Sequence, residues 1–299
     1  MRGKAVLLAA VTLLAAAACD TSSDHGLATA GRPRMGTGVP DLVGQADLVV
    51  DAKKLASSWL IDTEYLAPNL CSVIEGDVPP GTHQVLRFTV TTPNIGDADV
   101  AIGDPRVHID PNGDGDYSDS DGLYEFATCH HHFHFRNYAR YELLPLRADG
   151  TLGPSVKSRK RGFCMIDVTP FNETAAPKER VYPSCGTPEI AGNQGISVGY
   201  ADTYVKALAG QYFVLDDPAE PAAPGQYVLR ITVNPGFTPV NGEPCPVLDN
   251  HGLCHNFAES NYDNNVGQIT ITVPARNGKT GGSVQTATDY SDDENRPTN

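Results

Sequence analysis

Four of the nine histidines in this 299-residue chain lie within five consecutive positions, in the run 129–135 with the sequence CHHHFHF. If the run is extended, successive side chains alternate between two faces, so that His130, His132 and His134 point one way and His131 the other. Alternate Cβ atoms along a strand are about 6.5 to 7 Å apart, a gap that three imidazoles can close onto one ion. Neutral nitrogen donors that leave one coordination position open suit copper or zinc. The run therefore predicts a three-histidine copper or zinc site, with His131 outside it.

A second set of candidate ligands lies just upstream, in the acidic segment 110–121 (DPNGDGDYSDSD). Its oxygen donors fall at positions 1, 3 and 5, a glycine at position 6 and a carboxylate at position 12, which is the spacing of an EF-hand calcium loop. The spacing predicts a calcium site without flanking helices that braces the histidine run, and the alternative is an acidic, solvated turn. The candidate ligands are Asp110, Asn112, Asp114, Asp116 and Asp121.

The elements that must position these ligands have the pattern of strands. In 85–91 (VLRFTVT) apolar side chains alternate with polar ones, and 227–233 (YVLRITV) and 268–273 (QITITV) repeat this period. Such alternation between turn residues is typical of half-buried antiparallel strands. The 29 glycines and 23 prolines also favour turns and short strands over long helices. We therefore predict an all-β protein: a β-sandwich with long functional loops and little helix.

The first residues have the pattern of an export signal. Arg2 and Lys4 precede the apolar run 5–18, which is too short to span a bilayer and ends in small residues before Cys19. The pattern resembles a bacterial lipoprotein signal in which Cys19 carries the lipid, and ordinary cleavage nearby is the alternative. We expect a signal peptide at 1–18, a flexible tether at 19–40, a folded domain at 41–275 and a disordered tail at 276–299.

The charge balance narrows the choice of partners. The chain carries 36 Asp and Glu against 22 Lys and Arg, a formal net charge of −14. Because phosphate contacts need a basic face, this balance argues against nucleic acid and suits cationic substrates. No apolar run long enough to span a bilayer follows the signal. We therefore expect contact with a membrane only through the lipid on Cys19, and a place outside the cytoplasm, at the cell membrane or cell surface.

Apart from Cys19 the chain has six cysteines, an even number that implies disulfides in an exported protein. Six cysteines allow about fifteen connectivities, so their spacing leaves most of the pairing open. Cys245 and Cys254 lie close together in a loop rich in proline, asparagine and glycine, and we predict that they pair. The other four are Cys71, Cys129, Cys164 and Cys185.

Five segments, in this order along the chain, resemble those of the lysyl oxidases. The run 126–134, with its Cys-His-x-His-x-His core, resembles the copper-binding signature of that family. The segment 160–164 (KRGFC) resembles the one that carries the family's cofactor lysine, and 195–204 (GISVGYADTY) the one that carries its cofactor tyrosine. The segments 224–235 and 259–265 (ESNYDNN) resemble the family's last blocks.

The resemblance implies a copper amine oxidase that makes its own quinone. Copper and dioxygen would oxidise the ring of Tyr204, and the amine of Lys160 would add to it, which gives lysine tyrosylquinone. A carbonyl-bearing cofactor is needed because no unmodified side chain is an electron sink for amine oxidation. The implied reaction is oxidative deamination by dioxygen of cationic primary amines, with lysine-bearing polypeptides among the candidates, to aldehyde, ammonia and hydrogen peroxide. If the match to the family's cofactor-lysine segment shifts by three residues, Lys157 takes the role of Lys160.

This chain departs from the family pattern around the metal motif. Phe126 and Ala127 stand in a region where the animal enzymes carry tryptophans and an extra histidine, and Phe135 and Arg136 are bulkier and more basic than the usual pair. Tyr200 stands where those enzymes have a disulfide cysteine. The departures concern substrate choice and turnover more than metal binding.

The resemblance implies two further features. It pairs Cys129 with Cys185, which leaves Cys71 with Cys164. It also implies a structural calcium site that joins the first strand to the last and stabilises the fold. The ligands of this site would be Asp47, the carbonyl of Leu48, Glu259, Asn261, Asn264 and Asn265.

Two other functions are compatible with the same residues. One is a non-catalytic copper- and calcium-binding lipoprotein in which the quinone never forms. The other is a zinc hydrolase that uses the three histidines. A stain for carbonyl cofactors separates the first from an oxidase, and metal analysis of protein matured with copper separates the second.

Overall fold

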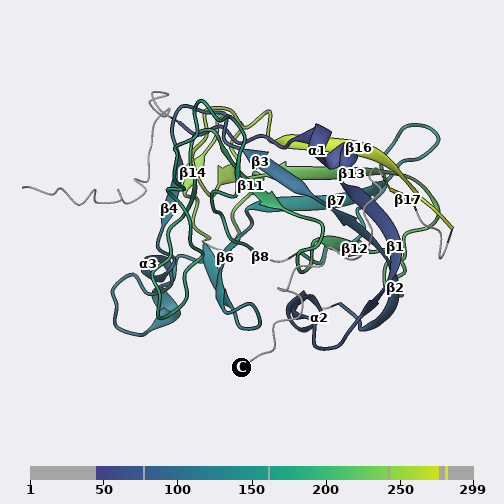
Figure 1. Ribbon diagram of the computed structural model, residues 1–299, viewed down its shortest axis with the longest axis horizontal. Coiled ribbons are helices and arrows are strands. Elements are labelled where there is room, and N and C mark those ends of the chain that lie inside the picture. The colour runs from purple at the N-terminus through teal and green to yellow at the C-terminus, as the bar shows by residue number, and fades with distance from the viewer. Residues whose placement is uncertain (1–44, 77, 161, 241–242, 276–279, 282–299) are drawn as a thin grey trace, which may run out of the picture. The chain divides into compact units, whose positions relative to one another are not determined.

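Short antiparallel strands form most of the regular structure in the computed structural model of the protein (Figure 1). The structure describes residues 45–76, 78–160, 162–240, 243–275 and 280–281. The expected signal peptide, the tether with Cys19 and all of the expected tail except 280–281 lie outside the described residues. Within the described ranges three short α-helices accompany the strands, so the predicted all-β fold with little helix is confirmed.

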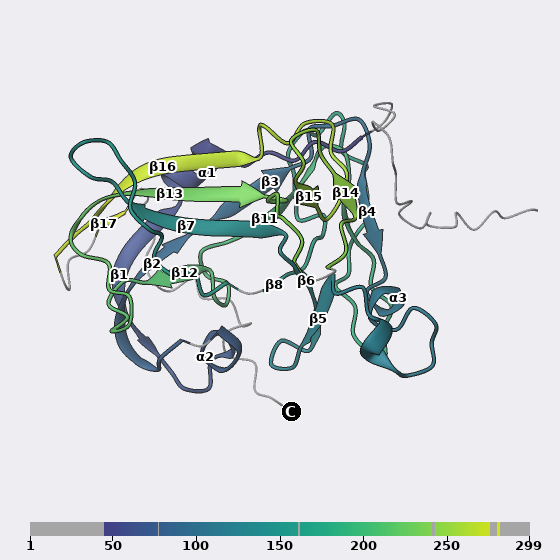
Figure 2. The same cartoon turned by 180° about the vertical axis from the view of Figure 1, so that it is seen from behind.

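Two sheets enclose the main core (Figures 1 and 2). The first contains β7 (Ala139–Pro145), β13 (Gly225–Val233) and β16 (Val266–Val273) in the order β16-β13-β7. The second contains β1 (Trp59–Leu66), β2 (Gly81–Phe88), β12 (Tyr212–Val214) and β17 (Thr280–Gly281) in the order β12-β2-β1-β17. The sheets meet through aromatic rings, since the ring centroid of Phe88 on β2 lies 5.2 Å from that of Tyr141 on β7. This packing is the predicted sandwich.

The alternation in the sequence predicts burial well for β16 and poorly for β2. On β16, Ile271 and Val273 are buried and the residues on either side of Ile271 are exposed, as the period of two predicts. On β2, Arg87 is only 4% exposed although it alternates with apolar residues. Its guanidinium donates to the Glu64 carboxylate at 2.9 Å and lies 4.6 Å from the centre of the Tyr212 ring. The prediction of a half-buried strand is wrong here, because an ion pair and a second small apolar cluster cover the other face of β2.

The three histidines, Lys160 and Tyr204 lie on or next to two smaller sheets. One contains β5 (Tyr124–Ala127), β6 (His132–Arg136) and β8 (Gly162–Phe163) in the order β5-β6-β8. The other contains β3 (Val90–Pro93), β9 (Thr169–Pro170) and β11 (Tyr200–Tyr204) in the order β3-β11-β9. Two strand pairs complete the fold: β4 (Val100–Gly103) with β10 (Gln194–Ile196), and β14 (Val247–Leu248) with β15 (Cys254–His255).

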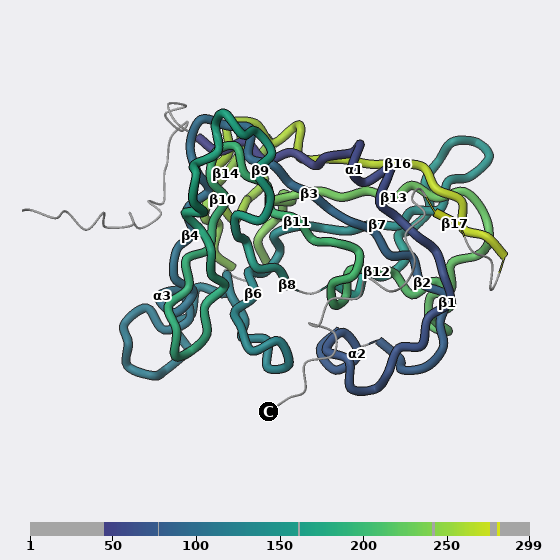
Figure 3. Tube along the Cα trace, in the orientation of Figure 1, coloured from purple at the N-terminus to yellow at the C-terminus, as the bar shows by residue number. Residues whose placement is uncertain are grey.

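The helices are one or two turns long. They are α1 (Ala52–Ser57), α2 (Cys71–Gly76) and α3 (Arg106–Ile109), and a 3-10 turn spans Tyr117–Asp119. The carboxylate of Asp51 caps α1 by accepting hydrogen bonds from two backbone amides of its first turn. In Figures 1 to 3, α2 lies on the same side of the molecule as the turn between β5 and β6. No helix in the described part of the chain is long and apolar enough to cross a membrane.

Three disulfides join the described cysteines, and two of them differ from the pairing that the resemblance implied. Cys245 pairs with Cys254 as predicted. Cys71 pairs with Cys129, and Cys164 with Cys185, each with a Cα–Cα distance of 5.4 Å. The implied pairs Cys129–Cys185 and Cys71–Cys164 are therefore wrong. The physical reason is the packing of α2 beside the β5–β6 turn, which brings Cys71 within the short Cα–Cα range that a disulfide needs.

Candidate functional site

The three histidines that the sequence predicted as copper ligands come together beside the turn of the β5–β6 hairpin. The ring centroid of His130 lies 5.7 Å from that of His132 and 5.2 Å from that of His134, and the last two are 4.9 Å apart. His132 and His134 belong to β6, whereas His130 lies in the turn before it. The expectation of one extended run is therefore wrong. The chain turns at His131, whose φ of 54° is left-handed and whose side chain is exposed, and this turn leads His130 to its partners.

Hydrogen bonds fix the rings of His130 and His132. Nδ1 of His130 lies 2.6 Å from Oε2 of Glu75, and Nδ1 of His132 lies 3.0 Å from the carbonyl oxygen of His130. Both partners only accept hydrogen bonds: one is a carbonyl oxygen and the other is an ionised carboxylate. Burial alone would raise the pKa of the Glu75 carboxyl, but the hydrogen bonds from His130 and the Cys129 amide outweigh burial and lower it. Each Nδ1 therefore carries the proton, and the lone pair of a neutral ring then lies on Nε2.

His134 is held neutral and packed against backbone. Burial, the positive charge of Lys160 and the two other histidines lower the pKa of His134 to about 2. A Cβ atom on Gly162 of β8 would meet the imidazole of His134 at 2.2 Å, so only glycine fits beside this ring. The sequence therefore needs a glycine at this close approach of two strands.

The donor set suits a copper or zinc ion in type, and its three rings lie close to one another. A metal–nitrogen bond of about 2.0 to 2.1 Å puts imidazole centroids around one ion about 4.5 to 5.5 Å apart, close to the three observed separations. In the part of the chain that the structure describes, no group of three or more histidine, cysteine, aspartate or glutamate side chains already has the geometry of a metal-holding set. The residues fit a three-imidazole ion through their chemistry and clustering.

Lys160 and Tyr204 are neighbours in space. Nζ of Lys160 lies 5.2 Å from the centroid of the Tyr204 ring and 5.4 Å from that of Phe163. Lys160 also lines one pocket together with His130 and His134. A phenol, an amine and three imidazoles are thus gathered from β11, the segment before β8, and the β5–β6 hairpin.

The Tyr204 ring is enclosed by other aromatic side chains. It is 6% exposed, meets Phe163 edge to face with centroids 5.2 Å apart, and its hydroxyl donates to the carbonyl of Cys164 at 2.9 Å. Burial and the nearby Asp202 carboxyl raise the pKa of the Tyr204 phenol well above its usual range. The phenol is therefore protonated at neutral pH and fixed in one orientation.

Asp202 is a buried carboxyl beside this ring that the sequence analysis missed. It is 1% exposed, and its Oδ2 has no hydrogen-bond partner among the described residues. Burial raises the pKa of Asp202 well above its usual range, against the opposite effects of the Tyr204 hydroxyl and the charge of Lys160. The sequence did contain one indication of Asp202: it lies two residues before Tyr204, and alternate residues of a strand share a face.

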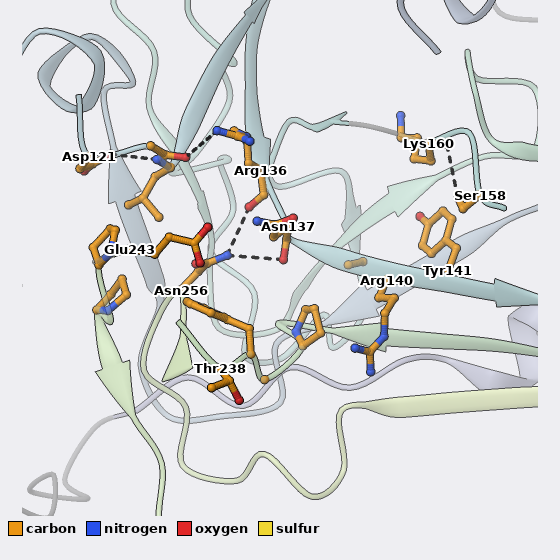
Figure 4. Close-up of a pocket in the computed structure, with 18 residues that line it drawn as sticks. Asp121, Arg136, Asn137, Arg140, Tyr141, Ser158, Lys160, Thr238, Glu243 and Asn256 are labelled. Atoms are coloured by element: carbon orange, nitrogen blue, oxygen red, sulfur yellow. Dashed lines mark hydrogen bonds between the residues drawn. The ribbon is translucent and has the colours of Figure 1, made fainter. Parts of the chain in front are cut away.

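Lys160 stands between two pockets. The smaller has a volume of about 270 Å³, and besides Lys160 and the two histidines it is lined by Glu75 and Glu125. The larger, about 540 Å³, is shown in Figure 4, with Lys160 and Ser158 at one end and Asp121 at the other. The lysine is therefore reachable from the space that holds the imidazoles.

Within the acidic segment 110–121, side-chain carboxylates accept hydrogen bonds from backbone amides of the same segment. The Asp110 carboxylate accepts from the amides of Gly113, Asp114 and Gly115, at distances from 2.8 to 3.1 Å. Asp121 instead lies 2.6 Å from Nδ1 of His108. The one-turn helix α3 ends just before Asp110, where the sequence suggested no helix. Calcium binding by Asp110, Asn112, Asp114, Asp116 and Asp121 stays a prediction.

The second set of predicted calcium ligands lies where residues 46–48 meet the segment 259–265. Glu259 is buried, accepts from the Leu48 amide at 2.6 Å and from Nδ2 of Asn265 at 2.9 Å, and Nδ2 of Asn264 donates to Asp47 at 2.9 Å. Burial raises the pKa of Glu259 to about 7. The side-chain carbonyl oxygens of Asn264 and Asn265 are buried without a hydrogen-bond partner among the described residues. Asn261 is exposed at the edge of this set.

A comparison with protein-family models gives one match, described as lysyl oxidase, over residues 47–244. The chain belongs to the lysyl oxidase family. A comparison with curated proteins returns no match. Membership of the lysyl oxidase family indicates an oxidoreductase of the copper amine oxidase type, which acts on amines with dioxygen. The three disulfides are typical of an extracellular protein.

The lysyl oxidase match covers the three histidines, Lys160 and Tyr204, and ends before Glu259. The residues that depart from the family pattern lie in different surroundings. Phe126 is partly exposed and lines the 270 Å³ pocket, whereas Tyr200 is buried in the core on β11. Ala127 lines the same pocket, and Arg136 lines the larger one, so three of the departures face space that a substrate can enter.

Proposed function

We propose that this protein is an extracytoplasmic oxidase of primary amines that uses copper held by His130, His132 and His134. Its organic cofactor would be lysine tyrosylquinone, made from Lys160 and Tyr204. The observation that carries the proposal is the position of Lys160 Nζ, 5.2 Å from the Tyr204 ring centroid and in one pocket with two of the histidines.

The chemistry divides between the metal, the modified ring and the protein. His130, His132 and His134 would hold the copper, which would supply the redox chemistry with dioxygen that converts the Tyr204 ring to a quinone, the electron acceptor that amine oxidation needs. Lys160 supplies the nitrogen that forms the new bond to a ring carbon of Tyr204, and Phe163 fixes the plane of that ring. The overall turnover balances as amine, dioxygen and water giving aldehyde, ammonia and hydrogen peroxide.

We assign to Asp202, which is buried beside Tyr204, the removal of the proton from the substrate carbon next to nitrogen. Its carboxyl lies against Tyr204, and among the described residues no group forms a hydrogen bond with its Oδ2 that would have to break first. Burial raises the pKa of Asp202, and a raised pKa makes the deprotonated carboxylate a stronger base for proton transfer from carbon.

The acidic charge of the protein would favour cationic amines. Glu75 and Glu125 line the pocket that contains Lys160, and the whole chain has a net charge of −14. Negative potential raises the local concentration of cationic amines and speeds association most at low salt. Lysine side chains of polypeptides are one such substrate class. A lipid on Cys19 would hold the enzyme at the outer face of a membrane.

The test of the proposal is direct detection of the cofactor and the product. Full-length protein matured with copper in air is expected to react with phenylhydrazine and to yield a proteolytic peptide in which Lys160 is joined to Tyr204. It is also expected to release peroxide from a panel of primary amines, in an assay to which catalase is added as the control. A cross-link at Lys157 would contradict the assignment of Lys160. Copper binding without a cross-link or peroxide would leave the non-catalytic binding protein, and zinc with hydrolysis would favour the hydrolase.

We also propose that calcium binds between the first described residues and the segment 259–265 and stabilises the fold. The buried side-chain carbonyl oxygens of Asn264 and Asn265 have no hydrogen-bond partner within the described ranges, and hard oxygen donors suit Ca²⁺. Adding calcium is expected to raise the midpoint of thermal unfolding, by an amount equivalent to about 2.7 kcal/mol at a hundredfold excess over the dissociation constant. Glu259→Gln is expected to remove most of this shift.

Asp110→Asn is the matched control, because it removes one carboxylate from the acidic segment 110–121 and leaves Glu259 in place. If the calcium-dependent shift survives Glu259→Gln and disappears in Asp110→Asn, the stabilising ion binds in the acidic segment and the clamp at 259–265 is wrong.

A further inference from the structure

Glu75 makes a two-point contact with the segment that carries the first histidine ligand. Its Oε2 lies 2.6 Å from Nδ1 of His130, and its Oε1 accepts from the backbone amide of Cys129 at 2.5 Å. Both side chains of the pair are mostly buried, 13% exposed for His130 and 19% for Glu75. One carboxylate thus fixes the backbone before His130 and the ring of His130 together.

The helix that carries Glu75 is anchored to the same segment by a covalent bond. Cys71 and Glu75 are four residues apart in α2 and therefore lie on one face of the helix. Cys71 forms the disulfide with Cys129, so that this face contacts the two consecutive residues Cys129 and His130. On its other side α2 is tied to the core sheet, because the Tyr212 hydroxyl and the Ser72 hydroxyl are 2.7 Å apart.

We propose that Glu75 is a positioning residue that sets the tautomer and orientation of His130 for copper binding. A metal-binding imidazole commonly donates its other N–H to a carboxylate, which fixes the ring and makes the ligand nitrogen more basic. Glu75 does this for a histidine that lies in a turn and lacks the support of strand hydrogen bonds on both sides. The inference rests on the proposed function, since it concerns the same copper site.

Glu125 provides a matched control for the charge of Glu75. It lines the same pocket and carries the same charge, but its side chain is 46% exposed, and the ion pair recorded for it is a loose one, 4.0 Å from Arg136. Removing either carboxylate changes the electrostatic potential of the pocket by the same formal charge. Only the replacement of Glu75 removes the carboxylate whose two oxygens contact the Cys129 amide and the His130 ring.

The experiment compares copper affinity in full-length wild type, Glu75→Gln, Glu75→Asp and Glu125→Gln. Copper(II) binding is measured by competition with a chromophoric chelator, and the copper environment by electron paramagnetic resonance. We expect Glu75→Gln to weaken copper binding about 10- to 100-fold and to change the resonance spectrum, while Glu125→Gln stays within about twofold of wild type. Thermal unfolding of the copper-free proteins shows whether the fold is retained. Glu75→Asp, which keeps the charge but shortens the side chain, is expected to weaken binding in the same direction.

The outcomes separate this inference from the function on which it rests. If wild type binds copper and His132→Ala does not, the three-histidine site is present. Glu75→Gln or Glu75→Asp with wild-type affinity and an unchanged spectrum would then overturn the role of Glu75 alone. If wild type binds no copper through the histidines, the proposed function and this inference both fail.

Discussion

Replacing Tyr204 with phenylalanine is expected to abolish peroxide release from primary amines and to leave copper binding unchanged. Phenylalanine has no phenol oxygen, so its ring cannot become the quinone, and no unmodified side chain is an electron sink for amine oxidation. The change removes one hydrogen bond, from the hydroxyl to the Cys164 carbonyl, which costs about 0.5 to 1.5 kcal/mol. The packing against Phe163 stays. The measurements are a peroxide-coupled assay, phenylhydrazine labelling and a copper titration.

Tyr200→Phe is the control for this experiment. Tyr200 lies on the same strand, β11, and is also buried, so the same substitution there tests the effect of a lost hydroxyl on the fold. Peroxide release in Tyr200→Phe is expected to match wild type. Undiminished peroxide release in Tyr204→Phe would refute the assignment of the cofactor tyrosine.

The alternation of apolar residues predicted the sheets because burial on one face of a strand leaves a period of two in the sequence. This holds for β16, whereas on β13 both alternating sets are buried, for example Val228 and Thr232 as well as Leu229. The sequence placed both strands to within three residues of their observed ends. It could not show that β2 is covered on both faces, since the second cover consists of an ion pair between Arg87 and Glu64. A charged residue in a strand predicts an exposed face unless its partner is known.

The sequence predicted those parts of the site whose residues lie close together along the chain, and missed those that depend on contacts between distant segments. The clustering of the three histidines follows from their closeness in the sequence, although a turn at His131 and not an extended strand brings His130 to the others. Glu75 had no detectable signal, because its contact with His130 depends on where α2 packs. The same packing decides that Cys71 pairs with Cys129, which explains why the disulfide pairing was wrong.

Replacing Asp202 with asparagine is expected to lower kcat for amine oxidation by about 100- to 10,000-fold, the range that a general base contributes. Asparagine has nearly the same shape and can remain buried beside Tyr204, but its amide cannot take a proton from carbon. The quinone itself is expected to form, so phenylhydrazine labelling should match wild type. Peroxide release and the anaerobic, single-turnover reduction of the quinone by an amine measure the loss. Full activity in Asp202→Asn, or absence of the quinone, would contradict the role of Asp202 as the base of turnover.

The pH dependence of kcat gives a second, independent measure of the same group. A base must be deprotonated to work, so kcat rises with pH through the pKa of Asp202 and falls as the medium becomes acidic. Burial and the neighbouring Asp167 raise the pKa of Asp202, whereas the Tyr204 hydroxyl, the Thr203 amide and Lys160 lower it, and burial dominates. The acidic limb of the profile is therefore expected well above the usual range for an aspartate, and Asp202→Asn is expected to remove that limb. If the limb persists in the variant, another group supplies the base, because an amide cannot titrate in this range.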